Sequence, residues 1–189
     1  MYLEPETIHY NNPLTGFEYD VMRHEYFSNR LFTRRETLIG FISWKWRQKT
    51  NISTITFREM IAHYEGFECY AFNPFPNAIT SYYNVWIDGE KWHPGILNLT
   101  QDLFDKIGYN IDLSQRRHTL ANATYCNYWV ATRSVWDQYI QFIEPFRELM
   151  LREEWKDNIW NYPYIIERLF SEFIQINNIS IKVFSKGYI

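Results

Sequence analysis

The chain has 189 residues, and its mass of 23.2 kDa is that of one ordinary domain. Aromatic residues make up 20% of it, glycine and proline number seven each, and the mean hydropathy is −0.43. This composition excludes collagen-like, low-complexity and disordered chains, because those lack the apolar area that offsets the entropy of ordering. We therefore expect one domain over residues 1–189, whose aromatic rings either fill a core or bind flat ligands.

The cysteines and the N-terminus indicate where the protein resides. Cys69 and Cys126 form no CxxC pair, so the sequence supports neither a disulfide framework nor a cysteine-based zinc site, and a reducing compartment is the simpler expectation. Cys126, inside an apolar stretch, is expected to be a core residue rather than a nucleophile. The first residues lack the pattern of a signal peptide, and no apolar run is long enough to span a bilayer. We expect a soluble, cytoplasmic protein.

The charge is uneven along the chain. The net charge is −3, yet residues 23–58 contain eight Lys and Arg side chains and only two Asp and Glu. Such a segment forms either a solvated face or a surface that binds an anionic ligand, whose phosphates the cations would complement.

The first half of the chain alternates between helical and strand patterns. The expected elements are an extended arm over 1–18, a helix over 19–32, a strand over 38–44, a helix over 52–64 with Ser53 or Thr54 as its N-cap, and a strand over 67–72. A strand, a helix and a strand with short connections predict a parallel pair with a right-handed crossover. Because ligands bind beyond the C-terminal ends of such strands, residues 45–49 and 73–77 are predicted to face a ligand.

The second half repeats the alternation. The expected elements are a helix over 97–107 closed by Gly108, a strand over 125–131, an amphipathic helix from Ser134 to Met150 that Pro145 kinks or restarts, a helix from 162 with Asn161 as N-cap, and a strand over 179–184. The resulting fold class is a small three-layer α/β domain with a mostly parallel sheet.

The segment after the first expected strand alternates aromatic and basic residues. If the strand continues, its period of two places Lys45, Arg47 and Lys49 on one side, facing phosphates, and Trp44 and Trp46 on the other. If the segment is helical instead, Lys45 and Lys49 align while Arg47 points away. A solvated loop that leaves an edge strand is the alternative to both.

Residues 84–95 are the richest in ionisable and aromatic side chains. Asp88, Glu90 or His93 is a candidate general base toward a hydroxyl group, and Trp86 offers a flat face to a ligand. The structural alternative is a tight turn at Asp88 and Gly89 between two short strands. The two interpretations are compatible with each other.

Motifs for metals and nucleotides are missing from the sequence. The five histidines follow no HExxH spacing, no Asp-x-Asp pair is present, and neither GxGxxG nor GxxxxGK[ST] occurs. No nucleophile elbow of the GxSxG type is present either. The cofactor is therefore unknown, and no metal-ligating residue is predicted.

The order of several segments resembles a family. The succession GFISWKWRQKT, FNPFPN, NVWIDGEKWHPG, YCNYWVATRSVWDQY and YIIERLFSEFI is similar to uncharacterised bacterial and viral glycosyltransferase-like proteins of capsular and surface polysaccharide synthesis. The resemblance spans about residues 20–184 and implies a Rossmann-like, GT-A-like sheet with a sugar-nucleotide pocket. The residues implied at that pocket are Trp44, Lys45, Arg47, Lys49, Asn73, Asn127 and Glu167. Trp86 and Trp129 lie in the same segments and are further candidates for stacking on sugar or base.

This resemblance implies a transferase that moves a sugar from a nucleotide-sugar donor to a hydroxyl of a saccharide acceptor. The lysines and Arg47 would offset the charge of the departing diphosphate. Two departures from the family stand out, because the chain is short and the Asp-x-Asp pair of a metal-assisted donor site is missing. The alternative is a non-catalytic carbohydrate-binding or scaffold module on the same fold. A nucleic-acid surface is disfavoured by the net charge of −3.

Overall fold

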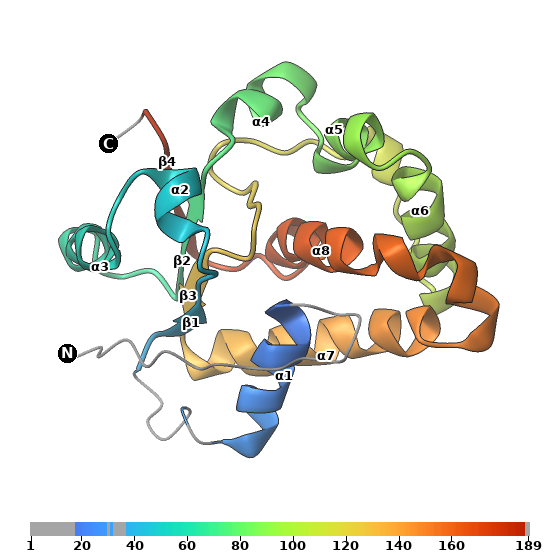
Figure 1. Ribbon diagram of the computed structural model, residues 1–189, viewed down its shortest axis with the longest axis horizontal. Coiled ribbons are helices and arrows are strands. Elements are labelled where there is room, and N and C mark those ends of the chain that lie inside the picture. The colour runs from blue at the N-terminus through green and yellow to red at the C-terminus, as the bar shows by residue number, and fades with distance from the viewer. Residues whose placement is uncertain (1–17, 30, 32–36, 188–189) are drawn as a thin grey trace.

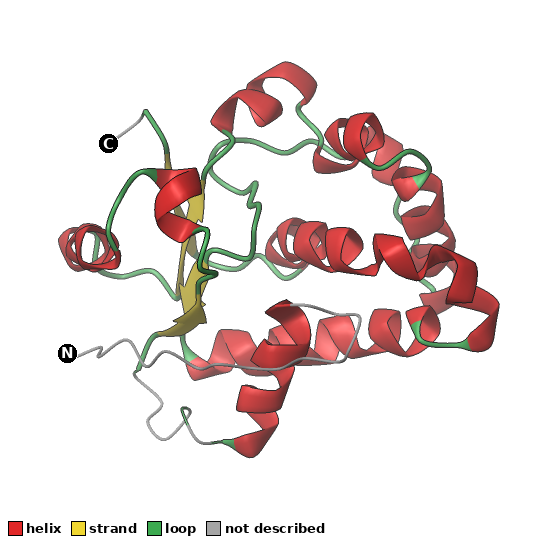
Figure 2. Cartoon of the chain, in the orientation of Figure 1, coloured by secondary structure: helices red, strands yellow, loops and turns green. Residues whose placement is uncertain are grey.

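The computed structural model describes residues 18–29, 31 and 37–187, which form a mixed α/β fold (Figure 1, Figure 2). The elements in chain order are α1 (Glu18–Ser28), β1 (Ile39–Phe41), α2 (Trp46–Thr50), α3 (Thr54–His63), β2 (Cys69–Asn73), α4 (Pro76–Tyr82), α5 (Val85–Trp92), α6 (Ile96–Ile107), the 3-10 helix η1 (Leu113–Gln115), β3 (Trp129–Ala131), α7 (Arg133–Met150), the 3-10 helix η2 (Glu153–Asn161), α8 (Tyr162–Ile176) and β4 (Ile181–Ser185). The predicted arm at 1–17 and the predicted end of the first helix lie outside the described residues.

The four strands form one mixed sheet in the order β1-β3-β2-β4. β3 runs antiparallel to both β1 and β2, and only β2 and β4 are parallel neighbours. The predicted mostly parallel sheet is therefore wrong, and so is the predicted parallel pairing of the first two strands. The physical reason is that β3, from late in the chain, inserts between β1 and β2, which the local pattern of each strand does not encode.

Helices cover both faces of the sheet. Phe72 of β2 and Phe184 of β4 meet Phe57 of α3, with ring centres 6.2 Å and 6.0 Å from the Phe57 ring. Trp129 of β3 stacks on Phe170 of α8, with ring centres 4.2 Å apart. Figure 1 shows the sheet between α2 and α3 on one side and α7 and α8 on the other. The predicted three-layer α/β arrangement is confirmed.

Residues 84–95 are helical, which corrects the predicted loop or hairpin turn. The side chain of Asn84 caps α5 by accepting hydrogen bonds from the backbone N–H groups of Trp86 and Ile87 at 2.8 Å and 3.3 Å. Gly89 is not a turn residue. A Cβ at this position would lie 3.0 Å from Nε of Arg168, so the glycine allows the Arg168 guanidinium to approach α5 closely.

The third strand is shorter than predicted. It begins at Trp129 rather than Tyr125, because Cys126 and Asn127 have positive φ angles of 68° and 53° and so cannot be part of an extended strand. The first strand is likewise shorter, since residues after Phe41 turn into α2.

Several helices are confirmed. Ser53 caps α3, and α6 ends at Gly108 in a left-handed conformation. α7 continues as one helix through Pro145, so the helix does not restart there. α4 and η2 were not predicted. Within the described part of the chain, no helix combines the length and apolar character that crossing a membrane requires.

Candidate functional site

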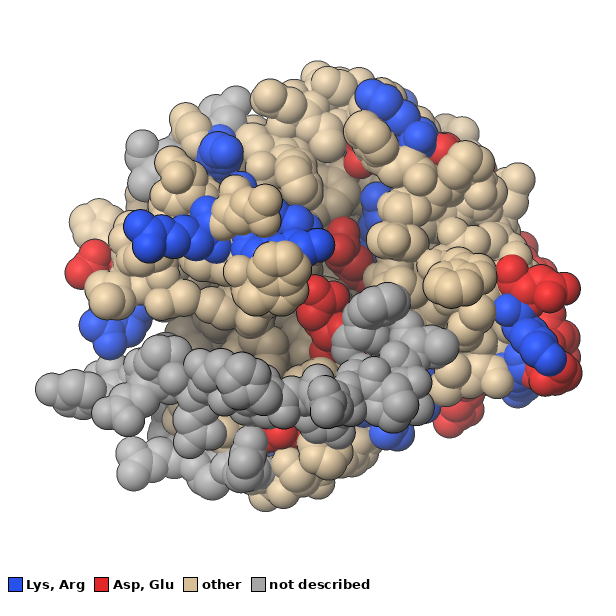
Figure 3. Space-filling view, in the orientation of Figure 1, with Lys and Arg blue, Asp and Glu red and all other residues tan. Residues whose placement is uncertain are grey.

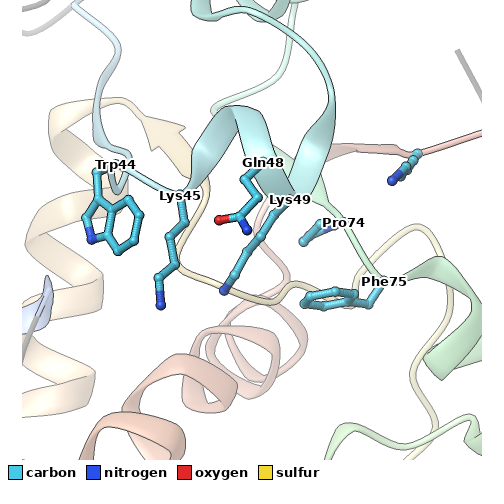
Figure 4. Close-up of a pocket in the computed structure, with 7 residues that line it drawn as sticks. Trp44, Lys45, Gln48, Lys49, Pro74 and Phe75 are labelled. Carbon is cyan, nitrogen blue, oxygen red and sulfur yellow. The ribbon is translucent and has the colours of Figure 1, made fainter.

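An open pocket of about 610 Å³ lies beyond the C-terminal ends of β2 and β4 (Figure 4). Its wall comes from α2 and the turn before it, from the segment after β2 and from the residue after β4. The lining residues are Trp44, Lys45, Gln48, Lys49, Pro74, Phe75 and Lys186. The two segments predicted to face a ligand, 45–49 and 73–77, both contribute. β2 and β4 are the parallel pair of the sheet, so the pocket occupies the position at which α/β sheets bind ligands.

The helical form of α2 decides which cations reach the pocket. Lys45 and Lys49 are four residues apart and so share one face of the helix, whereas Arg47 is exposed and is not among the lining residues. The strand-like comb with all three cations on one side is therefore wrong, and the helical alternative is the arrangement observed. The two tryptophans of this segment differ in the same way: Trp44 is 85% exposed, whereas Trp46 is 3% exposed and packs in the core.

Aromatic rings accompany the cations of the pocket. Nζ of Lys45 lies 5.0 Å from the centre of the Trp44 ring, and Nζ of Lys49 lies 5.8 Å from the centre of the Phe75 ring. Both rings are exposed on the pocket wall. Lys186 adds a third ammonium group, so the pocket suits a ligand that combines negative charge with a flat ring.

Lys49 also contacts the turn that precedes β3. Its ammonium donates a hydrogen bond to Sγ of Cys126 at 3.1 Å. The next residue, Asn127, is 6% exposed, and its Oδ1 has no hydrogen-bond partner among the described residues. Two consecutive non-glycine residues in the left-handed region are costly, and such strain concentrates at functional sites. The turn therefore borders the candidate site through Lys49. Cys126 is buried in the core as predicted, but it lies in a turn and not in a strand.

Carboxylates lie beside these lysines. Glu167 of α8 is half-buried and interacts electrostatically with Lys49, Cys126 and Tyr125. Glu18 of α1 interacts with Glu167 as well as with Lys45 and Lys49. Figure 3 shows Lys and Arg side chains gathered over α2, and Asp and Glu atoms in the hollow next to them. The structure thus brings Glu167, Lys45 and Lys49 together, from helices far apart in the sequence.

The three candidate bases of α5 and its C-terminal cap occupy different environments. Asp88 is buried and accepts a hydrogen bond from the Tyr125 hydroxyl at 3.1 Å. Glu90 accepts hydrogen bonds from the backbone N–H groups of Gly95 and Leu97 at 2.9 Å and 2.6 Å, so both of its oxygens cap α6. The hydrogen bonds to α6 make Glu90 a structural residue. Asp88 lies closer to the turn at Cys126 and Asn127, because its partner Tyr125 directly precedes that turn.

His93 is stacked on Tyr164 with ring centres 3.6 Å apart. Burial and the nearby Arg168 cation lower the pKa of His93, so its imidazole is neutral at physiological pH. Burial, followed by the charge of Asp88, raises the pKa of Tyr125 above its ordinary range. Tyr125 therefore stays protonated and keeps donating to Asp88.

Three predicted binding residues serve the architecture instead. Trp129 is fully buried against Phe170, and Trp86 is fully buried with its Nε1 donating to Glu172 at 2.9 Å. Asn73 is fully buried at the end of β2, where its Oδ1 accepts from the N–H of Phe75 at 2.8 Å and so shapes the start of the pocket wall. None of the three lines the pocket.

Glu172 of α8 is the centre of a buried polar network. Besides Trp86, it accepts from Nε of Arg116 at 2.7 Å, and Nε2 of His118 lies 3.0 Å from its Oε1. Burial raises the pKa of Glu172, but the hydrogen bond and charge of His118, the charge of Arg116 and the hydrogen bond of Trp86 together lower it below the ordinary value. The ionised carboxylate therefore ties α5 and the 116–118 segment to α8, the helix that carries Glu167.

The cations of the basic segment 23–58 that the structure describes have different surroundings. Arg23 forms an ion pair with Glu144 of α7 at 2.9 Å, while Lys45 and Lys49 line the pocket. Arg30, Arg34 and Arg35 lie outside the described residues. Only part of the predicted anion-binding surface is therefore visible at the pocket.

The pocket also contains four residues that were not candidates by themselves: Gln48, Pro74, Phe75 and Lys186. The first three lie in the segments predicted to face a ligand, and Lys186 lies outside them. Phe75 lies in the FNPFPN segment directly after a buried strand, which is a usable signal. Lys186 follows the last strand, and its position became informative only once β4 was known to pair with β2. No local pattern predicts that pairing.

Comparison of the chain with protein-family models, with curated proteins and with solved structures finds no match in any of the three. Among residues 18–29, 31 and 37–187, no three His, Cys, Asp or Glu side chains are grouped as they would be around a metal ion. The chemistry of the pocket is therefore the basis for a functional inference.

Proposed function

We propose that the protein is a glycosyltransferase, on a GT-A-like variant of the α/β fold, that moves a sugar from a nucleotide-sugar donor to a hydroxyl group of a saccharide acceptor. One observation carries the proposal: Lys45, Lys49 and Lys186 surround the same pocket as the exposed rings of Trp44 and Phe75. A nucleotide diphosphate combines the anionic groups that the lysines complement with a base that can stack on a ring. The resemblance of the sequence to glycosyltransferase-like proteins agrees with this chemistry.

The transfer step follows from the charges at the pocket. The acceptor hydroxyl oxygen bonds to the anomeric carbon of the donor sugar while the bond between that carbon and the diphosphate oxygen breaks. The electron pair leaves with the diphosphate, whose growing negative charge the ammonium groups of Lys45, Lys49 and Lys186 stabilise. The acceptor proton goes to a carboxylate, for which Glu167 is the candidate beside Lys49 and Asp88 is the next. Glu90 is excluded from this role by its capping hydrogen bonds.

The test is binding of nucleotide sugars, with Arg47 as an internal control. Saturation-transfer NMR with UDP-, GDP- and CDP-sugars at millimolar concentration detects the donor, and calorimetry gives its affinity for each variant. We expect Lys45→Ala and Lys49→Ala each to weaken binding about tenfold, because a hydrogen bond to a charged group contributes about 1.5 kcal/mol or more. Arg47→Ala removes a cation from the same helix but from outside the pocket, and should bind like the wild type.

Two results would overturn the proposal. The first is that a folded wild-type protein binds no nucleotide sugar at millimolar concentration. The second is that Arg47→Ala weakens binding as much as Lys49→Ala does, since non-specific attraction to a basic surface would then explain the affinity. Binding of glycans on an array without any nucleotide binding would support the carbohydrate-binding module instead.

A further inference from the structure

The turn at Cys126 and Asn127 brings a thiol to a lysine of the pocket. Sγ of Cys126 lies 3.1 Å from Nζ of Lys49, and residues 126 and 127 have φ angles of 68° and 53°. Side chains rarely adopt this backbone conformation, and here two neighbours adopt it in succession. In an extended strand, by contrast, the side chains of residues 125, 126 and 127 would point to alternate faces of the sheet. The thiol–ammonium contact thus lies at a turn whose backbone is strained.

We propose that Cys126 is a positioning residue for Lys49, whose sulfur accepts a hydrogen bond from the ammonium group and holds it beside the pocket before a ligand binds. The inference rests on the proposed function, in which the ligand of Lys49 is a diphosphate. A lysine side chain that is already ordered loses less rotamer entropy on binding an anion than a mobile one does. Lys45 differs from Lys49 in this respect, because its side chain is exposed and its ammonium group lies over the exposed ring of Trp44.

The groups around Lys49 keep it charged. Burial lowers the pKa of the Lys49 ammonium, but the hydrogen bond to Cys126 and the charge of Glu167 raise it above its ordinary value. Glu18 of α1 and Lys45, which precedes α2, are further charged groups close to this position. Burial raises the pKa of the Cys126 thiol to about 12, so at neutral pH a neutral sulfur faces a charged ammonium. The contact is therefore a hydrogen bond to a cation rather than an ion pair.

Two measurements on the full chain test the inference. The first is the affinity for inorganic diphosphate, measured by calorimetry for the wild type, Cys126→Ala and Cys126→Ser. The second is the pKa of Lys49 in the absence of ligand, from NMR of protein labelled at the lysine ε-carbon, with the resonance assigned by its loss in Lys49→Arg. Cys69→Ala is the matched control, because Cys69 is the other buried free cysteine and lies in β2, outside the pocket lining.

We expect Cys126→Ala to weaken diphosphate binding by up to about tenfold, which is the cost of ordering one long side chain on binding, and to lower the pKa of Lys49. Cys126→Ser retains an acceptor and should restore both properties, while Cys69→Ala should change neither. If Cys126→Ala does not fold, Cys126→Gly replaces it, since glycine accepts the positive φ and also removes the thiol.

The outcomes separate this inference from the proposed function. An unchanged pKa of Lys49 in Cys126→Ala overturns the inference, whatever the ligand. A lowered pKa in Cys126→Ala, together with a wild type that binds neither diphosphate nor any nucleotide sugar, supports the positioning role of Cys126 and refutes the proposed function. Equal losses of affinity in Cys126→Ala and Cys69→Ala would also overturn the inference, because a general loss of stability would then be the cause.

Discussion

Replacing Glu172 by glutamine should destabilise the protein strongly without changing the volume of its core. The side chain of Glu172 is fully buried and is contacted by Trp86, Arg116 and His118 at 2.7–3.0 Å. Glutamine offers one acceptor oxygen where the carboxylate has two, and its NH₂ group would face at least one of these donors. The substitution therefore leaves the guanidinium of Arg116 without its anion.

The magnitude follows from this burial. Removing one partner of a buried ion pair costs about 3–5 kcal/mol, but the Arg116 side chain is 23% exposed and water recovers part of the loss. We expect the free energy of unfolding to fall by about 2–4 kcal/mol. For a chain of this size each kcal/mol shifts Tm by about 2–4 °C, so Tm should fall by roughly 5–15 °C.

The effect should depend on pH in a defined direction. The pKa of Glu172 is lower in the folded protein than in the unfolded chain. The ionised Glu172 side chain therefore contributes its full stabilisation at pH values above the pKa of the unfolded chain, about 4.5. This stabilisation is lost as the pH falls through the pKa of the folded protein. Urea unfolding of the wild type and of Glu172→Gln should give stabilities that differ at pH 7 and converge as the pH is lowered below about 4.5.

Glu153→Gln is the matched control. It removes a carboxylate from an exposed pair with Lys156, whose side chains are 87% and 73% exposed, and should leave Tm within about 1 °C. A Glu172→Gln protein as stable as the wild type at pH 7 would refute the reasoning. So would a difference in stability that is the same at pH 7 and at pH 4, because the charge would then not be the cause.

Two further substitutions test local features of the fold. Glu90→Ala removes the side-chain cap of the Gly95 and Leu97 N–H groups and should lower the free energy of unfolding by about 0.5–2 kcal/mol, read from urea unfolding; an unchanged stability would show that the cap is not formed. Gly40→Ala places a Cβ on the carbonyl oxygen of Trp129 and 2.7 Å from Cα of the next residue, so it should disrupt the pairing of β1 with β3 and expose those amides to hydrogen exchange; protection equal to the wild type would contradict this.

Local sequence patterns predicted the amphipathic and capped elements well. α3 starts after Ser53, α6 ends at Gly108 and α8 contains Pro163 in its first turn, because caps and periodicity act over a few residues and need no tertiary partner. The segments 45–49 and 73–77 also reach the pocket, but they were predicted from a parallel pair of strands that does not form, and the binding of a ligand there stays a prediction.

Local sequence patterns gave wrong predictions where contacts with residues distant in the sequence determine the structure. Residues 85–92 were predicted to form a loop or a hairpin turn but form a helix, and the close approach of Arg168 across Gly89 accompanies this helix. Trp129 and Trp86 read as ligand-stacking residues because sequence cannot tell a tryptophan in the core from one in a site. Only their packing partners, Phe170 and Glu172, separate the two cases.

The sequence by itself determined which segments carry amphipathic helices, where α3 begins and α6 ends, and that two lysines four residues apart are separated from Arg47 if their segment is helical. Only the tertiary structure decided that β3 inserts between β1 and β2, that Lys186 joins the pocket and that Cys126 meets Lys49. Helix signals arise from neighbours within four residues, whereas strand order and site assembly depend on contacts between segments far apart in the chain.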